Sequence, residues 1–296
     1  MRVKVGFFSF ERSPAEEIVN ELIARNDVSG LHILKEDYIT GKNRIIDVTK
    51  INIHENYDSL LKNVDAIVAI LSKFEDYKIL SEALNSNKPV LVEGPLALSK
   101  EKLEEFIKKE EIICVPSVLD YDPYLKELLN AKKAIGDILS ISISARVKVY
   151  GHEIFPEVAL CALYRYLDIA CSVTETIVKN IVSVERAKDN SLMLLLESES
   201  GALISIDVIL TRVLSDMKVV IVGTEGSVTL DNLKQNFTIY TQEGRYQEFF
   251  GPKVYHSFLD YFFGVFLKGI KTKMNISYIK NLHETIISIR ELLKGI

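Results

Sequence analysis

The sequence has little of what marks several classes of protein. It has no tryptophan and only 3 cysteines in 296 residues, and the apolar run 66–71 is far shorter than the roughly 20 residues that cross a bilayer. Lysine and arginine number 36 against 41 aspartates and glutamates, so no general basic field attracts phosphate backbones. The composition therefore predicts no membrane and no nucleic-acid partner.

The cysteines Cys114, Cys161 and Cys171 lie in apolar segments, without the paired spacing of zinc sites or the density of a disulfide scaffold. The histidines form no ligand spacing, so we expect no metal. The chain opens on a strand-like segment, residues 2–8, which lacks the basic, apolar and small-residue series of a signal peptide. These features favour a reducing, cytoplasmic location.

The first part of the chain alternates buried-strand patterns with helical ones. Because 48% of the residues are hydrophobic and 26% charged, a sizeable folded core is expected. Short apolar runs recur at residues 3–8, 31–34, 66–71 and 90–92, with amphipathic segments between them. Apolar strands separated by helices indicate a parallel sheet covered on both faces, a doubly wound domain that ends near Pro116.

The pattern changes after Pro116. Residues 138–149 alternate as a long half-buried strand, and residues 157–171 have helical spacing. Six further strand patterns follow up to residue 240, with hairpin-type turns at residues 188–190, 200–201 and 225–226. We therefore predict a first domain over residues 1–117 and a second over residues 118–296, with a large, mostly antiparallel open sheet and a helical tail.

Two segments carry a resemblance to a known family. Residues 88–99 read KPVLVEGPLALS, and residues 221–227 read IVGTEGS. They resemble the "V-x-x-E-K-P-L-A-x-S" strand and turn and the "G-T-E-G-S" hairpin of the glucose-fructose oxidoreductase and inositol dehydrogenase family, Gfo/Idh/MocA. Weaker matches at residues 56–68, 123–138 and 201–206 extend the resemblance to essentially the whole chain.

The resemblance implies a Rossmann-like first domain that binds NAD or NADP. It implies hydride transfer to or from a sugar-like or other small carbonyl or hydroxyl substrate between the two domains. Family members commonly form dimers or tetramers through the open sheet, so a homodimer or homotetramer is expected.

The resemblance also places the cofactor. The positions that would contact it are Phe8, Ser9, Arg12, Lys35, Leu71, Ser72, Glu93, Gly94 and Pro95. Residues 9–14 read SFERSP, so none of the family's glycines stands in the turn that approaches the pyrophosphate. At the end of the second strand an acid would suit a ribose hydroxyl and a lysine a 2′-phosphate. Lys35 and Glu36 are both present, so the preference between NAD and NADP stays open.

The family's proton-transfer residues are replaced in this sequence. Gly94 stands where the family has the lysine of its E-K-P turn. Cys161 and Arg165 stand where the family helix "D-x-G-x-H-x-x-D" has its aspartate and histidine, and only the trailing acid, Asp168, is kept. Glycine carries no proton and arginine is a poor general base, so the usual proton relay is not expected here.

Three residues are the candidates for catalysis: Arg165, Tyr164 and His152. We expect Arg165 to pair with Glu93 and bind an anion or orient a carbonyl, the alternative being a place on the outer face of its helix. Tyr164 would orient the substrate, unless it belongs to the core. His152, just past the long strand, would replace the missing base, unless it is a structural histidine.

The sequence leaves two functions open. One is a divergent NAD(P)-dependent oxidoreductase with a degenerate site, in which the cofactor supplies the chemistry and the protein supplies geometry. The other is a catalytically inactive paralogue that serves as a ligand sensor or partner subunit. The missing glycines favour the second, and the family resemblance favours the first.

Overall fold

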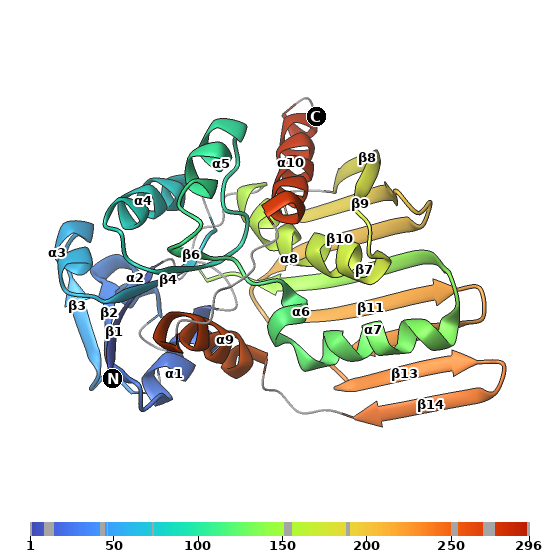
Figure 1. Ribbon diagram of the computed structural model, residues 1–296, viewed down its shortest axis with the longest axis horizontal. Helices are drawn as coiled ribbons and strands as arrows, with labels where there is room; N and C mark the ends of the chain where they lie inside the picture. Colours follow the sequence, from blue (N-terminus) through green and yellow to red (C-terminus); the bar gives the residue numbers. More distant parts are fainter. Residues whose placement is uncertain are drawn as a thin grey trace.

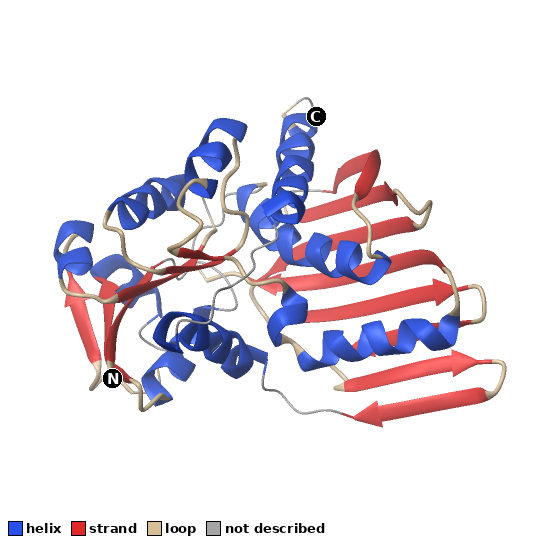
Figure 2. Ribbon diagram, in the orientation of Figure 1, coloured by secondary structure: helices blue, strands red, loops and turns tan. Residues whose placement is uncertain are grey.

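The computed structural model describes residues 2–8, 15–41, 45, 47–72, 74–150, 156–187, 190–249, 254–268 and 276–294. The chain forms two sheets side by side, one in each half of the molecule (Figure 1). Helices surround the first sheet and cover the front of the second (Figure 2). This arrangement confirms the predicted fold class.

The first sheet has six parallel strands in the order β3-β2-β1-β4-β5-β6. Its strands are β1 (Val3–Phe8), β2 (Val28–Leu34), β3 (Ile51–His54), β4 (Ala66–Ile70), β5 (Val90–Glu93) and β6 (Ile113–Cys114). All residues of β4 and β5 are buried, as expected for strands covered on both faces.

Helices connect these strands and supply their own caps. They are α1 (Ala15–Ala24), α2 (Lys35–Gly41), α3 (Tyr57–Lys62), α4 (Phe74–Asn85) and α5 (Lys100–Ile107). The Asn56 side chain accepts the Ser59 amide at the start of α3, and Ser99 accepts the Lys102 amide at the start of α5. In α1 the buried residues Ile18, Val19 and Leu22 recur at helical spacing and pack the helix on the sheet.

The second sheet has eight strands in the order β14-β13-β12-β11-β7-β10-β9-β8. They are β7 (Ile138–Lys148), β8 (Val178–Ala187), β9 (Ser191–Ser198), β10 (Leu203–Thr211), β11 (Asp216–Gly223), β12 (Gly226–Asp231), β13 (Asn236–Thr241) and β14 (Gly244–Phe249). Neighbours pair antiparallel except β7 and β10, which are parallel.

Among the described residues, helices pack against one face of this sheet. In β7 the side chains of Ile141, Ile143 and Ala145 are buried, whereas those of Ser142 and Ser144 are exposed. The short helix α6 (Val118–Tyr121) leads into α7 (Pro123–Ile135), which lies against β11, β12 and β13, and α8 (Glu157–Thr174) lies against β7, β9 and β10. The period-2 alternation that predicted a half-buried strand is thus confirmed.

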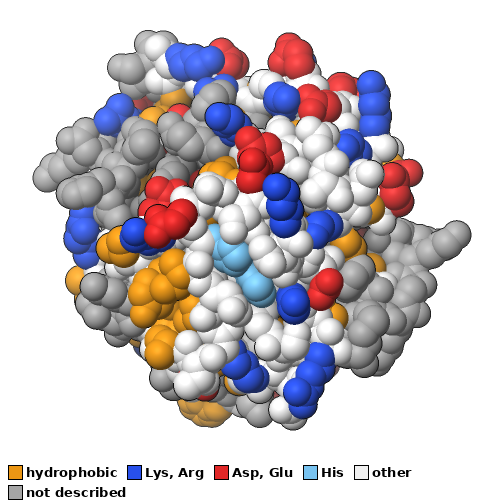
Figure 3. Space-filling view, turned by 90° about the vertical axis from the view of Figure 1, so that its left-hand side faces the viewer, with side chains coloured by type: hydrophobic (Ala, Val, Ile, Leu, Met, Phe, Trp, Pro, Cys, Tyr) orange, Lys and Arg blue, Asp and Glu red, His pale blue; other side chains and the backbone are white. Residues whose placement is uncertain are grey.

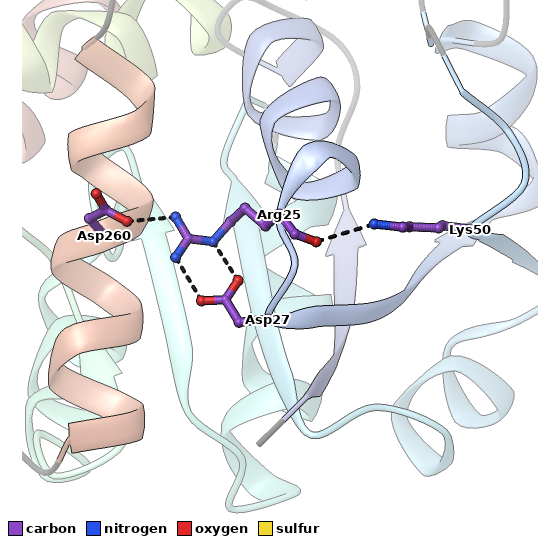
Figure 4. A network of polar contacts seen from close by, with 4 residues as sticks. All are labelled: Arg25, Asp27, Lys50 and Asp260. Carbon is purple, nitrogen blue, oxygen red and sulfur yellow. Dashed lines mark hydrogen bonds and ion pairs between the residues drawn. The ribbon is translucent and has the colours of Figure 1, made fainter.

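Helix α9 (Val254–Lys268) packs on α1 in the first half of the chain, and α10 (Ile276–Leu293) contacts α5 there and α8 and β8 in the second half. Figure 4 shows how α9 is held beside α1. The Arg25 guanidinium donates two hydrogen bonds of 2.8 Å to Asp27 and one of 2.7 Å to Asp260 on α9. The Arg25 guanidinium also lies 4.6 Å from the centre of the Phe263 ring. A helix from the end of the chain therefore packs against the layer of the first sheet. The predicted boundary at residue 117 lies between the two sheets, but packing contacts cross it.

Candidate functional site

The carboxyl edge of the parallel sheet forms the candidate site. The strand order runs outward in opposite directions from β1 and β4, so the topological switch point of the sheet, where doubly wound domains bind ligands, lies where these two strands end. Phe8 ends β1 and Glu93 ends β5, and the Leu71 amide beyond β4 donates to the Glu93 carbonyl at 3.0 Å. The structure therefore brings three of the expected cofactor residues to one edge. Ser9 and Arg12 lie outside the described residues.

Ser72 lies at the same edge, and its backbone is already engaged. Its side chain is fully buried, and its amide donates to an Asp76 carboxylate oxygen at 2.7 Å. Asp76 itself is only 1% exposed. Ser72 is therefore bonded internally to the side chain of Asp76 on α4.

The turn after β5, residues 93–96, is held by its backbone conformation and by hydrogen bonds to buried side chains. Gly94 has a φ of +117°, a conformation that side-chain-bearing residues rarely adopt. The Pro95 carbonyl accepts the Tyr77 hydroxyl at 2.9 Å, and the Leu96 amide donates to Nε2 of His283. The glycine therefore permits a backbone turn that a lysine at this position would strain. We call residues 93–96 the β5 turn.

His283 on α10 is fully buried and neutral. Its Nδ1 lies 2.6 Å from the Ile279 carbonyl oxygen, so Nδ1 carries the proton and Nε2 accepts from Leu96. Burial lowers the pKa of His283 to about 4. From the sequence, His283 is assigned to no site because the histidines lack ligand spacing, and its apolar helix neighbours Leu282 and Ile286 indicate a core position.

Helix α8 presents Cys161 to this turn. The Cys161 side chain is fully buried, and its sulfur lies 3.8 Å from the Tyr77 hydroxyl. All three cysteines, including Cys114 and Cys171, are free and buried. The residue at the family's aspartate position is therefore a packed thiol, as is typical of a structural cysteine.

Arg165, one turn further along α8, pairs with a buried carboxylate. Its Nη2 lies 3.4 Å from Oδ2 of Asp122, and the two side chains are 15% and 3% exposed. Asp122 also caps α7 by accepting the Tyr124 amide at 3.0 Å and the Leu125 amide at 3.3 Å. The expected pairing of Arg165 with Glu93 stays a prediction. Arg165 lies on the inward face of α8 and not on its outer face.

Tyr164 lies in the packed interior beside these groups. Its ring centre is 4.9 Å from that of His283, and the residue is 7% exposed. Burial raises the pKa of the Tyr164 hydroxyl well above its ordinary value. These contacts resemble those of a core tyrosine, and a substrate-orienting role for Tyr164 stays a prediction. His152 lies outside the described residues.

Asp168, the acid that the resemblance retains, joins three segments. It accepts the Val118 amide and the Tyr278 hydroxyl, each at 2.7 Å, and the Ser117 hydroxyl at 3.0 Å. The residue is 2% exposed. Asp168 therefore fixes α6 and α10 on α8, which is a structural use of the carboxylate.

The first turn of α1 carries acids where a dinucleotide-binding helix would face a pyrophosphate. Glu16 accepts the Tyr150 hydroxyl at 3.0 Å and lies 3.5 Å from Nζ of Lys148. Tyr150 and Lys148 belong to the end of β7 and the residues after it, so this contact joins the two sheets. Glu17 adjoins Glu16 in the same turn, and the helix start is correspondingly less favourable to a phosphate.

The opposite end of the edge, at β2 and β3, combines a partly buried histidine pair with an exposed ion pair. Nδ1 of His32 lies 2.8 Å from Nε2 of His54, whose Nδ1 lies 2.9 Å from the Ser59 hydroxyl. Burial lowers the pKa of His32 to about 4. Lys35 and Glu55 follow the same two strands and form an exposed ion pair of 2.8 Å. We call Lys35 and Glu55 the ribose end.

These groups fit the adenosine part of a dinucleotide, because exposed carboxylates can accept hydrogen bonds from ribose hydroxyls. The turn that would cradle the pyrophosphate lies outside the described residues. Within the described ranges, three or more His, Cys, Asp or Glu side chains do not gather as they would around a metal ion. Among the same residues, we find no helix with the length and apolar character that crossing a membrane requires.

Comparison with known proteins agrees with this architecture. Residues 36–112 match a family model described as an oxidoreductase family with an NAD-binding Rossmann fold. No curated protein matches the sequence.

Solved structures share the fold over the whole chain. A dehydrogenase from Chromobacterium violaceum has a TM-score of 0.75 at 17% identity, with 99% of this chain and 96% of that chain covered. A 3-ketoreductase from Actinomadura kijaniata, solved with TDP-benzene and NADP, has a TM-score of 0.77 at 15% identity, with 98% of each chain covered.

A third similar structure is a UDP-N-acetylglucosamine 3-dehydrogenase from Acidithiobacillus ferrooxidans, with a TM-score of 0.73 at 11% identity over 98% of this chain and 97% of that chain. The family match covers the strands and helices from α2 to the end of α5, and the shared fold covers both sheets. Residues 36–112 therefore resemble the Gfo/Idh/MocA oxidoreductase family, described with an NAD-binding Rossmann fold, and the rest of the chain shares the fold of the solved structures.

Proposed function

We propose that the protein is an NAD(P)-dependent dehydrogenase or reductase of a sugar-like or other small carbonyl or hydroxyl compound, with a catalytic site that departs from the family's. The family's NAD-binding Rossmann domain supports this proposal. Two neighbours with the same fold are named as a nucleotide-sugar 3-dehydrogenase and a 3-ketoreductase. Their activities motivate the substrate class.

The observation that carries the proposal is the junction of the two sheets, where charged side chains from both halves meet. Burial raises the pKa of the Tyr121 hydroxyl. The positive charge of Arg165 lowers this pKa, and the Glu93 and Asp122 carboxylates raise it, so all three groups act on the same hydroxyl. The Arg165 guanidinium lies 6.0 Å from the Tyr121 ring centre. A fixed cation and a buried carboxylate thus lie beside the edge where a nicotinamide would bind.

The cofactor and the protein side chains would have separate roles in the reaction. A bound nicotinamide cofactor supplies or accepts the hydride. Arg165 stays protonated, so it can hold the substrate oxygen and stabilise negative charge that develops there, but it does not act as a base. Glu93 and the β5 turn limit the substrate's position, and burial keeps water away. The proton for the substrate oxygen comes from His152 or water, with Tyr164 as the further predicted orienting group.

A second function, the catalytically inactive paralogue, is favoured by specific contacts. Gly94 adopts a φ of +117°, and the Cys161 sulfur is turned toward the Tyr77 hydroxyl. Glu16 occupies the first turn of α1 beside Lys148. Gly94 and Cys161 replace groups that the usual chemistry needs and Glu16 disfavours a phosphate, and a ligand sensor or partner subunit would tolerate all three.

Cofactor binding followed by turnover separates the two functions. A ligand that binds the folded state raises the midpoint of thermal unfolding in proportion to ln(1 + [L]/Kd). We expect millimolar NADH or NADPH to raise the midpoint and a panel of keto-sugars to oxidise the reduced cofactor. Arg165→Gln should slow that oxidation with little loss of cofactor binding. Binding without turnover across the panel supports the sensor, and no binding of either cofactor rejects the oxidoreductase.

We further propose a homodimer or homotetramer in the cytoplasm. The open face of the second sheet is exposed at Ser142 and Ser144, and Leu203 on the neighbouring strand is 50% exposed. Such a flat face of small and apolar side chains suits another copy of the sheet. Light scattering during size-exclusion chromatography tests the assembly. Three free cysteines favour a reducing compartment.

A further inference from the structure

The preference between NAD and NADP, open from the sequence, depends on two residues that the fold brings together. Leu34 at the end of β2 pairs with His54 at the end of β3. Since the strands are parallel, the next residues, Lys35 and Glu55, leave the sheet side by side at its carboxyl edge. This is the edge at which doubly wound domains meet the adenosine ribose of a dinucleotide.

Lys35 is not an isolated cation. Its Nζ lies 2.8 Å and 3.1 Å from the two carboxylate oxygens of Glu55. The side chains are 55% and 73% exposed, so a ligand can reach both. The charge that would attract a 2′-phosphate is therefore already balanced by a carboxylate.

Two further acids adjoin this pair in the chain. Glu36 and Asp37 lie in the first turn of α2, directly after Lys35. Burial raises the pKa of the nearby Tyr57 hydroxyl, and the Asp37 and Glu36 carboxylates raise it further. Figure 3 faces this end of the molecule and shows acidic and basic side chains interspersed over its described part, with histidine side chains between them.

We propose that Glu55 is a specificity-determining residue that makes the site prefer NAD over NADP. The argument rests on the proposed function, since it presumes that a dinucleotide binds at this edge. A 2′-phosphate carries a charge of about −1.5 to −2 near pH 7 and would meet an ammonium group already paired with Glu55, with two further acids in the adjoining turn of α2. A ribose with a free 2′-hydroxyl instead donates hydrogen bonds to these carboxylates. Glu55 thus both neutralises Lys35 and offers an acceptor.

Isothermal titration calorimetry of the full chain with NADH and with NADPH tests this assignment. The variant is Glu55→Gln, which keeps the side-chain shape and removes the charge. Because exposed ion pairs contribute little to stability, the variant should fold. The matched control is Glu105→Gln, which breaks the similarly exposed Lys102–Glu105 pair of 2.7 Å on α5.

We expect the wild-type protein to bind NADH at least about tenfold more tightly than NADPH. Glu55→Gln should narrow that ratio several-fold by strengthening NADPH binding, and Glu105→Gln should leave it unchanged. Added salt should narrow the wild-type ratio as well, because screening weakens exposed charges.

Two results would overturn the assignment while leaving the proposed function in place: NADPH binding as tightly as NADH, or an unchanged ratio in Glu55→Gln. Failure of the wild-type protein to bind either cofactor would instead reject the proposed function and, with it, the role of Glu55.

Discussion

The two ends of the parallel sheet's carboxyl edge are built in opposite ways. At the β5 turn, the polar groups of residues 93–96 are bonded to buried partners, including Tyr77 and His283. At the ribose end, Lys35 and Glu55 bond to each other in the open. The first end gains its geometry from packing and backbone conformation, so substitutions there should cost stability. The second depends on charge, so substitutions there should alter ligand preference and leave the fold intact.

The largest expected effect is on the buried end. His283→Ala removes the acceptor of the Leu96 amide and leaves a cavity, so we expect the free energy of unfolding to fall by about 4 kcal/mol. His54→Ala at the half-buried histidine pair should cost about 1 kcal/mol. Urea denaturation of both variants measures the difference. Equal losses would show that the two ends are not built differently.

Acid should destabilise the protein through the same histidine. The pKa of His283 is about 4 in the folded chain and near 6.5 when unfolded, so the unfolded state takes up the proton first as pH falls. Stability is then retained above about pH 6.5 and declines by about 3 kcal/mol toward pH 4. His283→Gln should flatten this limb of a stability-against-pH curve more than His54→Gln does. A wild-type curve that stays level from pH 7 to pH 4 would contradict the buried neutral histidine.

The turn glycine gives a smaller effect. Gly94→Ala forces a side chain onto a φ of +117° and should cost about 2 kcal/mol. Gly201→Ala is the control, because Gly201 also has a positive φ, +84°, but nothing lies within 4 Å of an added Cβ. We expect the Gly94 variant to lose more stability in thermal unfolding. If Gly94→Lys were as stable as the wild type, the turn would not require glycine.

The smallest effect on stability belongs to the exposed end. Glu55→Gln should change the free energy of unfolding by less than about 1 kcal/mol, because its partner Lys35 is solvated. Denaturation in urea beside the wild type measures this change. A loss as large as that of His283→Ala would mean that the ribose end supports the fold.

Much of the fold could be predicted from local patterns. The buried run in β4 and the alternation in β7 identified the two kinds of sheet, and these elements are confirmed. The short strand β3 and the edge strand β14 were missed, because INIH and GRYQEF carry neither a continuous apolar run nor a clear alternation. The parallel pairing of β7 with β10 follows from chain topology, which periodicity does not encode.

The site was less predictable, for a related reason. The sequence indicated that Gly94 serves a turn, and its positive φ confirms this. It did not indicate that Arg165 meets Asp122 or that Lys35 meets Glu55, since each pair joins residues distant in the chain. Composition and spacing report which groups exist, whereas the partner of each charge depends on the folded arrangement.

Amide hydrogen exchange with and without NADH tests whether the cofactor binds at the carboxyl edge of the parallel sheet, because it locates the cofactor as well as detecting it. If NADH binds at the carboxyl ends of the parallel strands, amide exchange should slow over residues 66–72 and 90–96 and stay unchanged in β13 and β14. No protection at the strand ends, or protection confined to the β13–β14 hairpin, would contradict an NAD-binding site at this edge.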